Sequence, residues 1–365
     1  MKVLQCIPNL AGGGAERQFC LLSRALASKG VEVHATFVPG GRNDALITDS
    51  ACHLHPIASN SSYDPRILGQ LYSLIRELSP DIVQTWLPQM DVLAGISSIA
   101  ARRPFVLSEL SGPGAYPLSF RVVARRLVGR FATAIVANSS TGLEYWADLN
   151  SSSLSRVIRN GRFPPEESSL PGTRYINKAL EQSDQPLILF VGRYHPDKNV
   201  LTAAQAIISV LRQNPSVNAL FLGEGPMRAQ LEAMIKEANL QRRFIIGPFA
   251  SNVPFWMERA SVFVSISNYE GQPNAVIEAA LLSTPLVLSD IRPHREFLSD
   301  EDALYVDQKN GSTVSEGIAS TLRDPGRAKV RGRSASDKVS KFSLDLMVSS
   351  FLKLYSDVIE SKRRL

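Results

Sequence analysis

The chain has 365 residues, of which 44% are hydrophobic and 20% charged, and its formal net charge is +6. This length exceeds one ordinary hydrophobic core, and this composition is typical of a soluble globular protein, so two domains are expected. The opening residues Met1–Leu10 contain one lysine and a short apolar run that ends at Pro8, which predicts a strand rather than a signal peptide. No apolar run in the sequence approaches the length of a membrane span.

Cysteine and histidine usage gives no sign of a metal site. Cys6, Cys20 and Cys52 lie in segments of core character and form no Cys-x-x-Cys pair, and the five histidines are scattered. Free thiols in a reducing cytoplasm fit this pattern best. We therefore expect a cytoplasmic protein without a bound metal.

Short apolar runs alternate with amphipathic helical patterns through the first half of the chain. Helices such as Ala15–Ser28 and Pro65–Leu78 fill the gaps between the runs. The predicted strands are Lys2–Ile7, Glu32–Val38, Ile82–Trp86, Phe105–Ser108, Ala134–Ala137 and Arg156–Ile158. Near-continuous apolar strands with helical crossovers predict a parallel sheet that is covered on both faces.

The second half restarts this pattern after a polar, proline-containing stretch at Pro164–Asp184. Its predicted strands are Leu187–Val191, Ala219–Leu222, Phe244–Ile246, Val262–Ile266, Leu286–Leu288 and Leu304–Val306. We predict two Rossmann-like, doubly wound α/β domains, at residues 1–168 and 180–345, and a C-terminal helix at 346–365 that returns toward the first domain. Such sheets bind ligands beyond the carboxyl ends of their strands, so a cleft between facing domains is expected.

A glycine-rich loop follows the first predicted strand. Gly12, Gly13 and Gly14 precede a helix, and three glycines let backbone N–H groups approach an anion at the helix N-terminus. The spacing is not Gly-x-Gly-x-x-Gly, so an NAD-dependent oxidoreductase is poorly supported. A flexible strand-to-helix turn is the equal alternative.

Positive charge is concentrated in the first half of the chain. Residues 101–131 contain six arginines and one acidic residue. On a helix at 118–131, one arc carries Phe120, Val123, Ala124, Leu127 and Phe131, and the arginines at 121, 125, 126 and 130 lie around the opposite side. Such a basic amphipathic helix suits an anionic membrane surface or a polyanionic, lipid-linked acceptor. The alternative is an ordinary helix that packs its apolar arc on the sheet and leaves the arginines in solvent. No aromatic-basic motif supports binding of nucleic acid.

A basic pair follows the first strand of the second half. Arg193 and Lys198 flank a turn that contains Pro196 and Asp197. A basic pair on a loop is often only solvated. At a strand end, however, an arginine and a lysine together can neutralise a diphosphate.

Two glutamates lie eight positions apart after the strand Val262–Ile266. Glu270 falls in a loop that ends at Pro273, and Glu278 lies about one turn into the following, largely apolar helix. Burying an isolated carboxylate costs several kcal/mol, so Glu278 needs a partner. An arginine or protonation would serve, and so would the vicinal diol of a ribose, whose two hydroxyls can donate to the two carboxylate oxygens.

The stretch EGQPNAVIEA resembles the Glu-x7-Glu signature of the retaining glycosyltransferases of family 4, which have the two-domain GT-B fold. The resemblance continues in order along nearly the whole chain. The matching segments are GGGAER, DIVQTWLPQMDVLAG, FVLSELSGPGAYP, IVANSSTGLEYW, VIRNG, FVGRYHPDKN, FLGEGPMRAQLE and PLVLSDI.

The resemblance implies roles for individual residues. Arg193 and Lys198 match the basic pair that holds the donor diphosphate, and Glu278 matches the glutamate that binds the ribose hydroxyls. The remaining donor-site matches are Glu270 with the backbone of Gly271, Gln272, Pro273 and Asn274 for the sugar and phosphate, Gly13 and Gly14 for the first-domain loop, and Gly223–Gly225 with Pro248–Phe249 near the nucleobase. The family's use of cationic side chains and helix dipoles at the leaving group implies that no divalent metal is needed.

Two strand ends of the first domain stay open to different interpretations. Many family members have a histidine where this chain has Glu109, which is either a polar contact to the sugar or acceptor with a part in catalysis, or a structural salt bridge. Trp86 is either a platform for an acceptor sugar ring or a core residue.

The resemblance implies a retaining glycosyltransferase that moves a sugar from a nucleotide diphosphate-sugar to a hydroxyl of a glycan or lipid-linked saccharide. A UDP-sugar is favoured as the donor, and lipopolysaccharide or other cell-envelope polysaccharide synthesis as the setting. We expect a cytoplasmic location, with peripheral contact to the inner membrane surface through helix 118–131. The alternatives are a catalytically silent, nucleotide-sugar-binding partner of an assembly complex and a sugar-nucleotide epimerase of the same fold.

Overall fold

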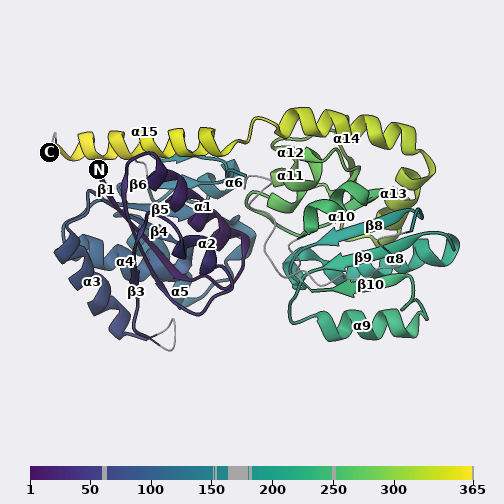
Figure 1. The fold of residues 1–365 in the computed structure, drawn as a ribbon, viewed down its shortest axis with the longest axis horizontal. Coiled ribbons are helices and arrows are strands. Elements are labelled where there is room, and N and C mark those ends of the chain that lie inside the picture. Colours follow the sequence, from purple (N-terminus) through teal and green to yellow (C-terminus); the bar gives the residue numbers. More distant parts are fainter. Residues whose placement is uncertain are drawn as a thin grey trace. The chain divides into compact units, whose positions relative to one another are not determined.

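The computed structural model describes residues 1–59, 64–150, 152, 154–162, 180, 183–248 and 252–363. The chain divides into two compact units (Figure 1). The first comprises Met1–Arg162 and Phe342–Leu365, and the second comprises Phe163–Lys341. The predicted linker at Pro164–Asp184 lies largely outside the described residues. Among the helices in the described ranges, none combines the length and the hydropathy that crossing a membrane requires.

The first unit contains a parallel sheet with seven strands in its described residues. They are β1 (Lys2–Asn9), β2 (Glu32–Val38), β3 (His53–Pro56), β4 (Ile82–Trp86), β5 (Phe105–Glu109), β6 (Ala134–Ala137) and β7 (Arg156–Val157). Their order is β3-β2-β1-β4-β5-β6-β7, and every neighbouring pair is parallel. The strand order reverses between β1 and β4, which is where doubly wound sheets bind ligands.

Helices flank this sheet, and the C-terminal helix belongs to the same unit. The helices are α1 (Gly14–Ser28), α2 (Ala45–Thr48), α3 (Arg66–Leu78), α4 (Leu87–Ala100), the short 3₁₀ helix η1 (Pro113–Ala115), α5 (Phe120–Gly129), α6 (Ser140–Glu144) and α15 (Leu344–Arg363). The hydroxyl of Tyr355 in α15 is buried and hydrogen-bonds with the side chains of Gln5 and Gln84. Asp357 pairs with Arg156 at 2.9 Å, and Phe351, Leu354 and Val358 are buried, so both polar and apolar contacts fix α15.

The second unit has a parallel sheet of six strands in its described residues, ordered β10-β9-β8-β11-β12-β13. The strands are β8 (Leu187–Val191), β9 (Asn218–Leu222), β10 (Phe244–Gly247), β11 (Val262–Ser265), β12 (Leu286–Ser289) and β13 (Leu304–Val306). The helices are η3 (Pro196–Lys198), α8 (Val200–Gln213), α9 (Arg228–Glu237), α10 (Val253–Arg259), α11 (Asn274–Leu281), α12 (Arg292–Arg295), α13 (Gly311–Arg323) and α14 (Pro325–Val339). Here the order reverses between β8 and β11.

The predicted fold class is confirmed, because both units are doubly wound parallel sheets with helical crossovers. The predicted bounds of β8 and β13 are those of the structure. The sequence interpretation missed β3, the edge strand with the sequence His-Leu-His-Pro. A short, partly exposed edge strand lacks the apolar run by which buried parallel strands are recognised.

Candidate functional site

The carboxyl ends of β8 and β11 lie side by side at the point where the strand order of the second sheet reverses. The two strands are parallel neighbours, with Val262 opposite Ile188. The loop after β8 carries Arg193 and Lys198, and the loop after β11 carries Glu270. Adjacent parallel strands therefore bring two separately predicted groups to one edge of one sheet.

Lys198 and Glu270 form an ion pair at this edge. Lys198 Nζ lies 2.5 Å from Glu270 Oε1, and Ser267 Oγ donates to the same oxygen at 2.7 Å. The side chain of Lys198 is 21% exposed and that of Glu270 is 11% exposed. The pair is thus half-buried and keeps access to solvent, which leaves the ammonium group able to receive a second anion.

Arg193 is held beside this pair by Asp197. Its guanidinium donates to Asp197 Oδ2 at 2.7 Å, and the imidazole of His195 contacts Oδ1 of the same carboxylate at 2.7 Å. Asp197 is buried, whereas the arginine side chain is 65% exposed. The backbone N–H of Asn268 donates to the carbonyl of Asp197 at 2.8 Å and thereby ties the two loops together.

The predicted donor loop leads directly into α11. Gly271, Gln272 and Pro273 are buried, and Asn274 begins the helix. Glu278 lies one turn into α11 and is half-buried, although its neighbours Val276 and Ile277 are buried. Glu278 is therefore not fully enclosed by its apolar neighbours, as a contact to an external diol requires.

The predicted nucleobase loop is closely packed against the loop that follows β8. A Cβ on Gly223 would lie 1.9 Å from the carbonyl oxygen of Gly192, and a Cβ on Gly225 would lie 2.4 Å from that of Tyr194. Gly225 also has φ +157°, which L side chains rarely adopt. Only glycine fits these two positions, so the loop can approach the carboxyl edge of β8. Phe249 lies outside the described residues.

The glycine loop of the first unit lies at the carboxyl end of β1, again at the reversal of strand order. Gly13 has extended backbone angles and caps α1, which begins at Gly14. Gly12 has φ +120°, so the loop requires glycine there. A Cβ on Gly13 would lie 2.4 Å from the carboxylate of Glu16, a flexible side chain in the first turn of the helix.

Glu109 is buried in a network that belongs wholly to the first unit. Its Oε1 accepts from Ser111 N at 2.9 Å and from the Tyr116 hydroxyl at 2.6 Å, while Oε2 accepts from Arg125 at 2.9 Å and from Trp146 Nε1 at 3.0 Å. A carboxylate has about four acceptor sites, and these four donors use them. Of the two alternatives for Glu109, the geometry supports the structural salt bridge over a contact to the sugar or acceptor.

Trp86 is a core residue rather than an acceptor platform. Its side chain is buried, its indole N–H donates to Gln5 Oε1 at 2.7 Å, and its ring meets Phe19 edge-on at 5.9 Å between centroids. Both the apolar ring and the polar N–H are thus satisfied inside the unit.

The predicted amphipathic helix is present as α5, but its apolar arc faces away from the sheet, against one of the two alternatives. The apolar arc does not pack on the sheet: Phe120, Val123 and Leu127 are exposed. Arg125 is buried instead, with Nε 2.7 Å from Asp91 and the guanidinium 2.9 Å from Glu109. The alternative of an apolar arc packed on the sheet is therefore wrong. Its solvated arginines are confirmed for Arg121 and Arg130, which are exposed, but not for Arg125, which two buried carboxylates draw inward.

The sequence interpretation did not include His294, which lies beneath the donor loop. The ring is buried, and its Nδ1 contacts the carbonyl oxygen of Ser289 at 2.9 Å, while Nε2 has no hydrogen-bond partner among the described residues. Burial lowers the pKa of His294, against the opposing effects of the Ser289 contact and of Glu270, so a neutral imidazole is favoured. The signal was available: His294 closely follows a predicted strand, β12, at the same edge of the sheet.

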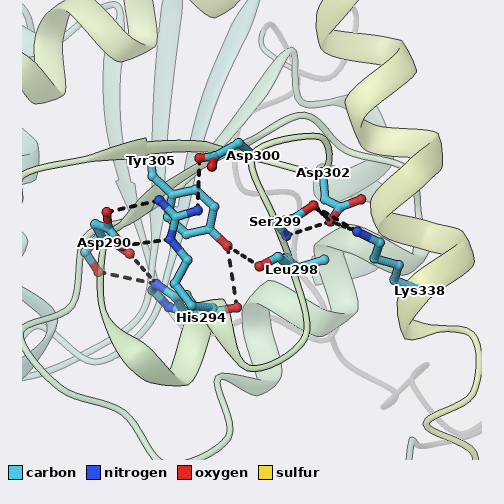
Figure 2. Close-up of polar contacts among 10 residues, drawn as sticks. Asp290, His294, Leu298, Ser299, Asp300, Asp302, Tyr305 and Lys338 are labelled. Atoms are coloured by element: carbon cyan, nitrogen blue, oxygen red, sulfur yellow. Dashed lines mark hydrogen bonds and ion pairs between the residues drawn. The ribbon is translucent and has the colours of Figure 1, made fainter.

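An ionic cluster fixes the short helix that carries His294. Arg295 donates to Asp290 at 2.7 and 3.0 Å and to Asp300 at 2.9 Å, and its guanidinium carbon lies 3.5 Å from the centre of the Tyr305 ring. Figure 2 shows Asp290, Asp300, His294 and Tyr305 gathered in this cluster. The Tyr305 hydroxyl donates to the carbonyl of Leu298 at 3.0 Å. The cluster therefore braces the segment between β12 and β13.

Two family models match the chain. The model described as "Glycosyl transferases group 1" matches residues 173–338, and the model described as "Glycosyltransferase Family 4" matches residues 12–162. The first match contains the edge of the second sheet with Lys198 and Glu270. The second match contains the glycine loop and the buried network of the first unit.

Two curated relatives are similar along nearly their whole length. The lipopolysaccharide core biosynthesis glycosyltransferase LpsE of Rhizobium meliloti (strain 1021) is 26% identical over 349 residues, covering 94% of this chain and 95% of that protein. The N-acetylgalactosamine-N,N'-diacetylbacillosaminyl-diphospho-undecaprenol 4-alpha-N-acetylgalactosaminyltransferase of Campylobacter jejuni is 25% identical over 364 residues, covering 92% of this chain and 94% of that protein.

Solved structures share the fold. HepE of Anabaena, crystallised in complex with UDP and glucose, superposes with a TM-score of 0.81 over 98% of this chain and 100% of that chain, at 18% sequence identity. At this identity the likeness concerns the fold alone, and it shows the GT-B architecture. The two family matches, at residues 12–162 and 173–338, show that the chain belongs to the family 4 glycosyltransferases.

Proposed function

We propose that this protein transfers a sugar from a UDP-sugar to a hydroxyl of a glycan or lipid-linked saccharide, with retention of the anomeric configuration, in the synthesis of lipopolysaccharide or another cell-envelope polysaccharide. The relatives support this class of acceptor, because one is named for lipopolysaccharide core synthesis and another for a substrate linked to diphospho-undecaprenol. Acceptors of the second kind are membrane lipids, so we further propose that the protein works at the cytoplasmic face of a membrane.

One observation carries the proposal: the cations Arg193 and Lys198 lie with Glu270 at the reversal point of the second sheet. Asp197 pairs with Arg193 and Glu270 pairs with Lys198, so both cations are oriented before a substrate binds. Pre-oriented charges stabilise a developing anion without the cost of reorganisation in the transition state.

The geometry suggests a separate role for each of these side chains in the transfer step. The anomeric carbon exchanges its bond to the diphosphate oxygen for a bond to the acceptor oxygen. The acceptor hydroxyl gives its proton to the departing diphosphate, and the remaining negative charge leaves with UDP. Arg193 and Lys198 would stabilise that charge, in a role that other enzymes give to a metal ion. Glu270 would orient Lys198 and contact the donor sugar. Glu278, which is half-buried on α11, would accept from the two ribose hydroxyls. We therefore propose transfer without a divalent metal.

Thermal melting of the purified chain with UDP, GDP and their sugar conjugates tests the donor site, because a ligand that binds the folded state raises the melting temperature. We expect a shift with UDP and a UDP-sugar that persists in EDTA. The shift should be lost in Glu278→Ala and kept in Glu316→Ala, a matched change of an exposed glutamate on α13.

A transfer assay with the stabilising donor and a lipid-linked saccharide then tests the reaction, and NMR of the product gives its anomeric configuration. Binding of UDP-sugar without transfer to any acceptor would favour a silent binding partner. An inverted anomer would exclude retention, and a requirement for Mg²⁺ would exclude the metal-free mechanism.

A further inference from the structure

Helix α5 turns its apolar side away from the protein. Residues 120, 123, 127 and 131 recur at helical spacing and form one stripe, which Leu118 extends at its start. The exposed fractions are 97% for Leu118, 86% for Phe120, 50% for Val123, 55% for Leu127 and 67% for Phe131. We call these five residues the α5 apolar face. Ser119 Oγ accepts from Val122 N at 3.4 Å and caps the helix directly before the stripe.

The opposite side of α5 is fixed by polar contacts of Arg125 and by Val128, which belongs to the apolar core of the first unit. Arg125 reaches Asp91 on α4 and Glu109 on β5, and its guanidinium carbon lies 4.8 Å from the Tyr116 ring centre and 5.0 Å from that of Trp146. Removing either partner of such a buried ion pair leaves an uncompensated charge in the interior. Arg125 and Val128 face the interior of the first unit, and the apolar face therefore lies on the outward side of α5.

An apolar stripe of this kind marks an interaction surface. Single exposed apolar side chains are common, but contiguous exposed patches in soluble proteins mark contacts with a partner, ligand or membrane. Phe120, Val123 and Leu127 lie on α5 itself, whereas Leu118 precedes the helix and Phe131 follows it. A helix with an exposed apolar side suits insertion among lipid headgroups and chains, as interfacial helices insert.

The charge around the stripe indicates the kind of medium. Between Leu110 and Phe131 the chain contains four arginines and no acidic residue. Arg121 and Arg130 are exposed and lie near the two ends of the stripe. Arginines beside an inserted apolar face attract anionic lipid headgroups.

The position of the stripe connects it with the substrate-binding edge of the first sheet. The chain leaves the carboxyl end of β5 at Glu109, passes through η1 and enters α5, which returns along the sheet. Leu118 and Phe120, the two most exposed residues of the face, therefore come at the start of α5, toward the carboxyl edge of the first sheet.

We propose that the α5 apolar face, with Arg121 and Arg130, binds the surface of an anionic lipid bilayer. Its use in catalysis rests on the proposed function, since a protein docked in this way meets a lipid-linked acceptor at the surface where that acceptor lies. The binding itself depends only on the first unit.

Co-sedimentation of the full chain with lipid vesicles tests the proposal, without donor or acceptor present. We expect binding to vesicles of phosphatidylglycerol mixed with phosphatidylcholine and much weaker binding to vesicles of phosphatidylcholine alone. The double variant Phe120→Ser/Leu127→Ser should bind at least about tenfold more weakly. The double variant Arg121→Gln/Arg130→Gln should lose about fivefold for each charge removed. Val330→Ser, a matched change at an exposed position on α14, should bind like the wild type.

Three results would overturn the proposal. The first is no binding to either kind of vesicle, and the second is equal binding to both. The third is self-association in sedimentation velocity that needs Phe120 and Leu127, without vesicle binding, because the face would then join two copies of the chain. Thermal melting checks that each variant is folded. If the chain binds vesicles but transfers no sugar, the proposed function fails and this inference stands.

Discussion

Polar side chains lie at the carboxyl edges of both sheets, but they are buried at the first edge and partly exposed at the second. At the edge of the first sheet, Trp86 and Glu109 end neighbouring strands, and both are buried with their polar atoms bonded inside the unit. At the edge of the second sheet, Arg193, Lys198 and Glu270 pair with one another or with Asp197, and the cations keep exposed surface.

The difference shows what separates a structural ionic group from one that is available to a ligand. The four acceptor sites of Glu109 are used by four donors. The two contacts described for Glu270 both fall on Oε1. Position at a strand end is therefore not sufficient to identify a functional residue. Burial and the remaining hydrogen-bonding capacity must be known as well.

The strongest test of this comparison is Arg125→Ala, which leaves Asp91 and Glu109 buried without their cation. We expect a loss of roughly 3–5 kcal/mol in the free energy of unfolding, because an uncompensated charge stays in the interior. Urea denaturation measures the loss. Arg126→Ala is the matched control, since that arginine contacts the exposed Asp148 and Tyr145 and leaves no buried carboxylate behind, so its loss should cost about 1 kcal/mol. Equal stability of the two variants would contradict a structural role for the buried network.

The opposite behaviour is expected for Lys198→Ala. The transfer rate should fall by about 10²–10³-fold, as for the loss of one preorganised charge contact in a transition state. The unfolding free energy should change little, because the lysine pairs near solvent. Lys236→Ala, at an exposed position on α9, should leave both quantities unchanged. A transfer rate like that of the wild type would remove Lys198 from the donor site.

The stability of the buried network should also depend on pH. Burial raises the pKa of Asp91 to about 6, against the opposing effect of Arg125. The unfolded value is about 3.9, so between these two values the folded state binds a proton that the unfolded state does not. The contribution of Asp91 to the unfolding free energy therefore falls by about 2–3 kcal/mol as the pH rises from about 4 to about 6.

Asp91→Asn isolates this contribution, because the amide oxygen can still accept from Arg125 and the Thr85 hydroxyl can turn to accept from the amide. We expect the stability of the variant relative to the wild type to rise through this pH window, as measured by urea denaturation at several pH values. A constant difference would show that Asp91 does not titrate there.

The smallest expected effect concerns Trp86→Phe. The variant loses the donor to Gln5 Oε1 and should be less stable by roughly 1–2 kcal/mol. The KM for the acceptor should stay at the wild-type value, because the ring lies in the core. A raised acceptor KM with unchanged stability would restore the platform interpretation.

Much of the architecture could be predicted from the sequence. Near-continuous apolar runs separated by amphipathic helices indicated two parallel sheets, and the strands β8 and β13 have the predicted bounds. The residues that follow β8 and β11 were also identified, because parallel topology puts strand ends on one edge. The edge strand β3 was missed, since its two histidines and proline give no apolar pattern.

The sequence by itself determined the fold class, the two groups of charged residues after β8 and β11, and the apolar arc of α5. These features depend on local periodicity and on the order of strands. Only the tertiary structure decided which side of α5 faces the protein and which strand-end residues stay accessible. Arg125 is buried because Asp91 and Glu109 meet it from α4 and β5, 34 and 16 positions away in the chain. Contacts between distant residues fix burial and hydrogen bonding, and no local pattern records them.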